Sequence, residues 1–144
     1  MWINQPQPVY DRLYKHDDFE ALVYILSESE GGRVAPVFNG IRWDLCYARD
    51  DSENGLYMIW PDFFGESKKS WPSNEPLPVG EAISGRFLIV NDKMRHVHQK
   101  LLAVGTEFFC HEGPKRVARG TVSKITGLRD DEAKTRRAGS HRPN

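Results

Sequence analysis

The apolar residues of this chain occur in short runs that are separated by glycine, proline and asparagine. None of these runs keeps the 3.6-residue period of an amphipathic helix, and most are rich in β-branched and aromatic residues, as strands are. The runs that we expect to be strands cover residues 21–26, 41–48, 56–60, 82–90, 104–110 and 116–126. About six short strands predict an all-β barrel or sandwich, and closure into a barrel would remove the exposed strand edges.

Length and composition place the chain in a broad class. Its 144 residues suffice for one domain with a single core, and its zero formal net charge gives no general sign of nucleic-acid binding. The sequence shows no secretory leader and no apolar run near the ~20 residues that span a bilayer, so we expect a cytoplasmic protein without membrane contact. Cys46 and Cys110 are expected to be reduced core thiols, although a disulfide stays geometrically open.

The residues that an enzyme needs do not occur in the required patterns. The sequence has no phosphate-binding G-x-x-x-x-G-K-[ST] loop, no G-x-S-x-G elbow and no C-x-x-C pair. The adjacent acids at 17–18 and 50–51 would point to opposite faces of a strand, which is wrong for paired acid–base catalysis. His96 and His98 lack partners at metal-ligand spacing. We therefore expect no catalytic residue, no metal site, no cofactor and no small-molecule substrate.

Motifs near both ends of the strand-rich region resemble one known domain. Residues 19–27 read FEALVYILS, residues 30–33 read EGGR, and residues 120–125 read GTVSKI. They resemble the F-E-x-x-V-Y-x-L-S strand, the E-G-G-R turn and the closing G-V-V-x-K-I of the third, C-terminal domain of bacterial elongation factor Tu. The resemblance extends over residues 19–125, without the GTPase domain that precedes this domain in the family.

The resemblance implies an architecture and its boundaries. We expect a closed six-stranded antiparallel (Greek-key) barrel at residues 19–128, with an N-terminal arm at 1–18 and a disordered charged tail at 129–144. Residues 61–78 have no family counterpart of that length and are interpreted as an insertion. Residues 91–102 are polar and basic, exceed the family's connection in length, and are interpreted as a loop.

The resemblance also implies a binding role without catalysis. In the family this domain contacts the T-stem of aminoacyl-tRNA, the GTPase domain and the exchange factor elongation factor Ts. The residues that match the family's tRNA contacts are Arg33, Arg42, Glu112 and Gly113. Such residues suit backbone recognition, because a guanidinium forks onto phosphate oxygens and glycine lets the main chain approach a ribose.

The matching surface departs from the family in charge. Asp44 stands where the family has glutamine, His111 where it has arginine, and residues 50–54 replace hydroxyl and apolar residues by mainly acidic and amide ones. A carboxylate repels phosphate, and RNA affinity depends on phosphate neutralisation. We therefore expect tRNA binding that is weak at best.

The insertion carries aromatic side chains beside several prolines, namely Phe63, Phe64 and Trp71. If exposed, they would be anchors for a protein partner, because aromatic side chains are enriched at the centres of interfaces. The alternative is that they pack onto the barrel wall, and the sequence leaves both interpretations open.

The sequence thus predicts a non-enzymatic binding module that is associated with translation. Its expected partner is a protein, either a translation factor or a protein that binds elongation factor Tu, with tRNA as a weak second ligand. The alternative is a decoy or immunity-type mimic of elongation factor Tu that binds a protein which normally targets it.

Overall fold

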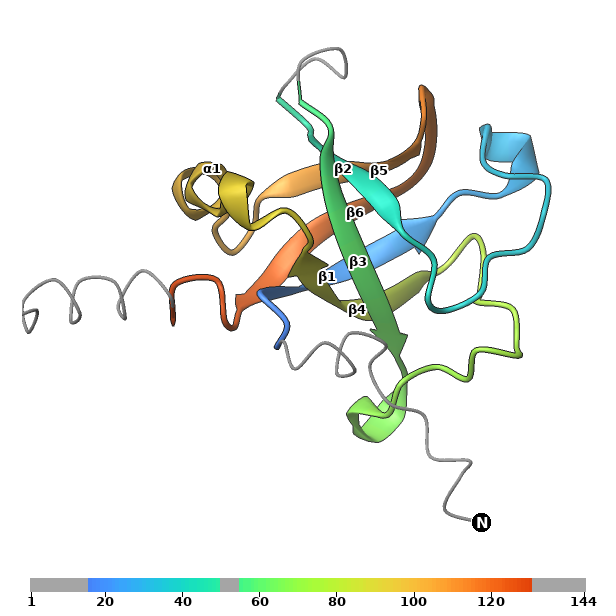
Figure 1. The fold of residues 1–144 in the computed structure, drawn as a ribbon. Coiled ribbons are helices and arrows are strands. Elements are labelled where there is room, and N and C mark those ends of the chain that lie inside the picture. Colours follow the sequence, from blue (N-terminus) through green and yellow to red (C-terminus); the bar gives the residue numbers. More distant parts are fainter. Residues whose placement is uncertain (1–15, 50–54, 131–144) are drawn as a thin grey trace, which may run out of the picture.

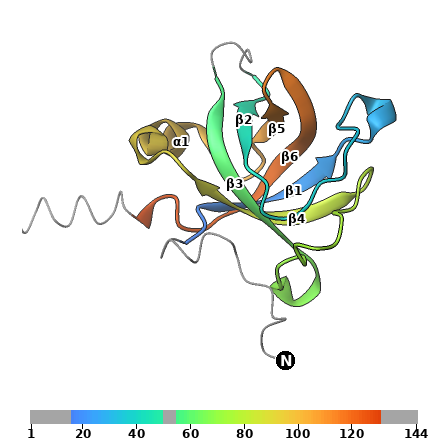
Figure 2. The same ribbon diagram turned by 45° about the vertical axis from the view of Figure 1, so that its right-hand side comes forward.

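The computed structural model describes residues 16–49 and 55–130 (Figure 1). It contains six strands, which are β1 (Phe19–Ile25), β2 (Trp43–Tyr47), β3 (Tyr57–Phe64), β4 (Ala82–Ile89), β5 (Glu107–Glu112) and β6 (Lys115–Ile125). They close into a barrel in the order β1-β4-β3-β2-β5-β6, and every neighbouring pair is antiparallel (Figures 1 and 2). The closed six-stranded antiparallel barrel that the sequence predicts is confirmed.

The expected ends of the chain fall mostly outside this description. The N-terminal arm at 1–18 is described only from residue 16, and the charged tail at 129–144 only to residue 130. The acidic segment at 50–54 also lies outside the described residues. The proposed domain boundaries therefore stay predictions.

Alternation of side chains along β1 shows how the barrel interior is filled. Phe19, Ala21 and Val23 are completely buried, while Leu22 between them is exposed and Tyr24 is half-buried. Successive strand residues point to opposite faces, so one set fills the interior and the other forms the outer wall. All six strands contribute inward-facing side chains to one hydrophobic core.

Stacked aromatic rings form the centre of that core. Phe19 and Phe87 are parallel with ring centroids 4.9 Å apart, and Phe108 meets both rings edge-on at 6.0 and 5.6 Å. Gly120 of β6 lies opposite Phe108, and a Cβ atom there would come within 2.4 Å of the ring. A glycine at this position therefore leaves the space that the phenylalanine ring occupies.

Strand β3 extends further than the sequence predicts. Residues 61–64 were assigned to the insertion, but they continue β3 and pair with β4, Pro61 opposite Phe87 and Phe64 opposite Ser84. Proline is tolerated here because β2 pairs with β3 only as far as Ile59, so no neighbour on that side needs the missing N–H. The insertion proper is therefore shorter and begins after the strand.

A buried polar cluster attaches this shorter insertion to the barrel. Asp62 of β3 is fully buried and pairs with Arg86 of β4, whose Nη2 lies 2.9 Å from its Oδ2. Ser70 Oγ donates to the same oxygen at 2.8 Å, and Asn39 Nδ2 donates to Oδ1 at 2.9 Å. Arg86 Nη2 also donates to the carbonyl of Lys68 at 3.0 Å. We call Asp62, Arg86, Ser70 and Asn39 the Asp62 cluster.

The expected loop at residues 91–102 contains a short helix instead. A 3-10 turn (Asp92–Met94) leads into α1 (Arg95–Leu101), where His98 is completely buried and its Nδ1 lies 2.5 Å from the hydroxyl of Tyr47. Burial, with nearby Arg95 and His96, lowers the pKa of His98 to about 4, so its ring is neutral at pH 7. A helix of one to two turns is too short to show its apolar period in the sequence.

Within the described residues, no helix is long and apolar enough to cross a membrane.

Both cysteines are buried as free thiols. Cys110 pairs in register with Leu45, so Cys46, the next residue of β2, points to the opposite face of the sheet from Cys110. Burial raises the pKa of the Cys110 thiol, which keeps it protonated and unreactive.

We expect neither thiol to react with Ellman's reagent in the folded protein. After denaturation in guanidinium both should react at once, because burial rather than a disulfide protects them. The measurement is the absorbance of released thionitrobenzoate before and after denaturation. Fast reaction of either thiol in the native protein would show that the strand carrying it opens readily.

Candidate functional site

The residues that match the family's RNA contacts come together at one end of the barrel. Arg33 lies in the loop after β1, Arg42 immediately precedes β2, Glu112 ends β5, and Gly113 begins the turn to β6. Figure 1 shows this loop and the β5–β6 hairpin on the same side of the barrel. We call these residues, with Trp43, Asp44, Met58, Trp60 and His111 beside them, the rim site.

Glu112 connects two of the segments. Its Oε2 lies 3.2 Å from Arg33 Nε and accepts a hydrogen bond from Trp43 Nε1 at 2.9 Å. Arg33 also donates from Nη1 to the carbonyl of Pro36 at 3.1 Å. The charge of Arg33 is therefore matched by a carboxylate of the same surface, and its side chain is only 24% exposed.

Arg42 is held by an aromatic ring instead of an acid. Its Cζ lies 4.0 Å from the centre of the Trp60 ring, and Trp60 Nε1 donates to the carbonyl of Gly40 at 3.0 Å. Gly40 has a φ of +106°, which favours glycine and explains why an Asn-Gly pair at 39–40 suits this turn. Arg42 is thus an exposed, oriented guanidinium on a tryptophan face.

A groove of about 330 Å³ lies between these residues and the outer face of β2 and β3. The groove is bordered by Arg42, Trp43, Asp44, Met58, Ile59, His111, Glu112 and Gly113. Met58 pairs with Asp44 across the strands and is 52% exposed. The sequence interpretation overlooked Met58 and Trp43. Met58 and Trp60 alternate with the buried Ile59, which is the pattern of residues on an outer face.

Two ionisable residues in the groove differ in exposure. Asp44 lies beside His111 in the sheet and is half-buried. His111 is almost completely buried, and burial lowers its pKa, while the backbone of Gly113 and the charge of Asp44 oppose this shift. The imidazole is therefore neutral at pH 7 and adds no positive charge to the rim site.

The aromatic residues of the expected insertion lie mainly in the protein interior. Phe63 is completely buried in the core, with its ring centroid 6.0 Å from that of Trp43. Phe64 is 7% exposed, and the Arg86 guanidinium lies over its ring. Trp71 packs against the core and donates from Nε1 to the carbonyl of Glu75. In this structure Phe63 and Phe64 do not present the exposed surface that a docking anchor needs, because β3 carries them into the barrel.

The described residues contain no group of three or more His, Cys, Asp or Glu side chains arranged to hold a metal ion. His98 faces Tyr47 in the interior, whereas His96 is exposed on α1, so the two histidines of this segment do not share a site.

No protein-family model matches this chain. The resemblance to the third domain of elongation factor Tu therefore depends on the motifs at residues 19–33 and 120–125.

Proposed function

We propose that this protein is a non-enzymatic binding module, associated with translation, that uses the rim site to contact a protein partner and binds tRNA only weakly. One observation carries the proposal. Arg33, Arg42, Glu112 and Gly113 match the family's contact residues, and they lie on one surface although three separate segments supply them. A shared surface is what a common ligand requires.

The charge of the rim site favours a protein over RNA. Arg33 is paired with Glu112, and Asp44 lies in the same groove as Arg42. With His111 neutral, Arg42 is left as the main cation available to a phosphate in this groove. Affinity for RNA grows with the number of phosphates neutralised, so a site with one such arginine binds RNA weakly.

The apolar side chains of the rim site favour the same partner. Met58 is half-exposed beside the groove, and the partly exposed Trp60 is held by a hydrogen bond from its indole nitrogen to the carbonyl of Gly40. Tryptophan, methionine and arginine are enriched in the cores of protein–protein interfaces. Rim residues of this kind can bury apolar area against a protein partner while Arg42 supplies directional hydrogen bonds.

Affinity capture from the cytosol of the source organism tests this proposal. The double variant Arg42→Ala with Met58→Asp should bind the principal partner about tenfold or more weakly, because both side chains line the groove of the rim site. The matched control is Lys124→Ala with Val104→Asp, at exposed positions outside the rim site. RNase treatment should not release the partner. Equal capture by the rim variant would disprove the assignment of the surface.

Competition separates translation-associated binding from mimicry. If the captured partner also binds elongation factor Tu, and elongation factor Tu displaces it from this chain, then this chain acts as a decoy at the partner's surface. If elongation factor Tu does not compete, the partner recognises this chain through contacts of its own. In both cases binding depends on the rim site.

We expect tRNA to bind weakly and with a shallow dependence on salt. With one or two phosphate contacts, the logarithm of the binding constant plotted against the logarithm of the salt concentration has a slope of about −1 to −2. Arg42→Ala should make this slope shallower by about one. Fluorescence titration of labelled tRNA between about 50 and 150 mM salt measures both quantities. Tight binding at the higher salt that is lost in Arg33→Ala and Arg42→Ala would make RNA the principal ligand.

A further inference from the structure

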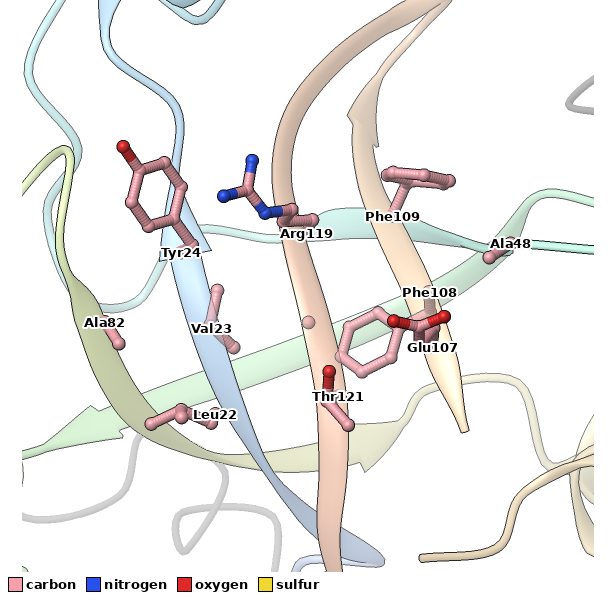
Figure 3. A pocket seen from close by; sticks show the side chains of 11 residues that line it. Leu22, Val23, Tyr24, Ala48, Ala82, Glu107, Phe108, Phe109, Arg119 and Thr121 are labelled. Atoms are coloured by element: carbon pink, nitrogen blue, oxygen red, sulfur yellow. The ribbon is translucent and has the colours of Figure 1, made fainter. Parts of the chain in front are cut away.

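A second groove, of about 250 Å³, crosses the outer face of β1, β6 and β5 (Figure 3). Two cross-strand rows of outward side chains border it, because the register places their members opposite one another. One row is Ala82, Tyr24, Arg119 and Phe109, and the other is Leu22, Thr121 and Glu107. None of these residues belongs to the rim site, so this groove is a separate surface.

The first row holds its guanidinium in place with aromatic rings. Arg119 Cζ lies 4.2 Å from the centre of the Tyr24 ring, and Figure 3 shows its side chain between Tyr24 and Phe109. The neighbouring Arg116 lies over Phe109 at 3.7 Å. Stacking limits the freedom of both side chains without using their N–H donors, so less entropy is lost when an acceptor binds.

The donors of Arg119 and Arg116 are not used by acidic residues of the described part of the chain. The described ion pairs involve Arg33, Lys68, Arg86 and Arg95, and neither groove arginine is among them. A guanidinium offers donors in a planar fork that matches a carboxylate. The charge of Arg119 also acts on Glu30, but none of the described ion pairs uses its donors, so they remain available to an external anion.

Much of the remaining groove lining is apolar. Leu22 is 51% exposed, and Val23 and Phe108 contribute to the groove lining where Gly120 lacks a side chain. An apolar side chain placed there would cover Leu22 and remove apolar area from water on both partners. The groove thus combines an apolar depression with an arginine at its edge.

The acids near the groove distinguish a peptide from a nucleic acid. Glu107 lines the groove, and Glu30 accepts a hydrogen bond from the Tyr24 hydroxyl at 2.9 Å. A phosphate chain running along the groove would meet both carboxylates as well as the arginines, and its ribose and phosphate groups would not use the apolar floor. A single carboxylate beside an apolar side chain meets no such conflict.

We propose that this groove binds an extended segment of a partner protein in which an apolar side chain lies next to an acidic residue. The apolar side chain packs on Leu22 beside Gly120, and the carboxylate accepts hydrogen bonds from Arg119. The inference is independent of the function proposed for the rim site, since the two grooves share no lining residue.

A random heptapeptide library displayed on phage tests the proposal. The full-length protein should enrich peptides that combine Leu, Ile, Phe or Trp with Asp or Glu. For a synthetic peptide of the enriched sequence, calorimetry should show binding about tenfold or more weaker to Arg119→Gln, because a charge-assisted hydrogen bond is lost. Leu22→Ser should weaken binding as well, and so should replacing the peptide's acid by its amide.

Arg42→Gln is the matched control, because Arg42 is an exposed arginine stacked on an aromatic ring in the rim site. It should leave peptide binding unchanged, and Arg119→Gln should leave capture of the rim-site partner unchanged, so either proposal can fail alone. Failure to enrich any peptide, or enriched peptides that bind Arg119→Gln equally well, would overturn the inference. Binding of a single-stranded RNA dodecamer that depends on Arg119 would reassign the groove to nucleic acid.

Discussion

Replacing Arg86 by methionine is expected to destabilise the protein by about 3–5 kcal/mol. The substitution keeps most of the apolar stem but leaves the Asp62 carboxylate fully buried without its counter-charge. It also removes the donor to the carbonyl of Lys68, which holds the insertion against the barrel. The main reason for the size of this effect is that the charge of Asp62 stays buried without compensation. The lost attraction between the two side chains contributes less.

Urea denaturation and thermal melting measure this expectation. The melting temperature should fall by roughly 10 °C or more, as follows for a domain of this size. Arg42→Met is the control, because that arginine is stacked on Trp60 at the surface and should change stability by less than about 1 kcal/mol. Adding Asp62→Asn to Arg86→Met should recover part of the loss. An Arg86→Met protein as stable as the parent would show that water reaches Asp62.

Gly120→Ala is expected to destabilise the protein by about 1–3 kcal/mol although it adds only one methyl group. The new Cβ would lie 2.4 Å from the Phe108 ring, so the ring must move within a core that is already filled. Alanine usually makes a strand more stable than glycine does. The expected loss of stability is therefore opposite in sign to the change that intrinsic strand propensity alone predicts.

Relief of the clash provides the test. Gly120→Ala with Phe108→Leu should be more stable than the sum of the two single substitutions predicts, which a double-mutant cycle in urea measures. Gly65→Ala is the matched control, because nothing lies within 4 Å of the added Cβ and the glycine does not have a positive φ. Strict additivity in the cycle would mean that the ring and the new methyl group do not compete for space.

The fold was largely predictable because strands of this barrel leave local signals. Each of the six expected runs overlaps an observed strand, and the turn at Gly40 has the positive φ that its sequence suggests. The errors occur where non-local contacts decide. Pro61 reads as the end of a strand, but the missing partner beyond Ile59 allows β3 to continue. Helix α1 packs beside Tyr47, which contacts His98 of the helix. The sequence around residue 98 does not reveal that Tyr47 lies there.

The surfaces were predictable to different degrees. Arg33, Arg42 and Glu112 were singled out only through the resemblance, and the contact between Arg33 and Glu112 depends on barrel closure. The groove beside Arg119 was overlooked, because its lining residues come from separate strands and become neighbours only through the register of three of them. Alternation identifies which residues face outward, but it does not show which of them share a row.

The pairing of β1 with β6 affects how the barrel can be made during protein synthesis. Of the six strands of the barrel, β1 leaves the ribosome first, and it is fully paired only when β6 has followed, because β6 is one of its two neighbours. Until that strand emerges, one edge of β1 and one edge of β5 have no neighbour. An unpaired strand edge is a template for association with other chains. The nascent barrel therefore stays prone to aggregation until β6 becomes available.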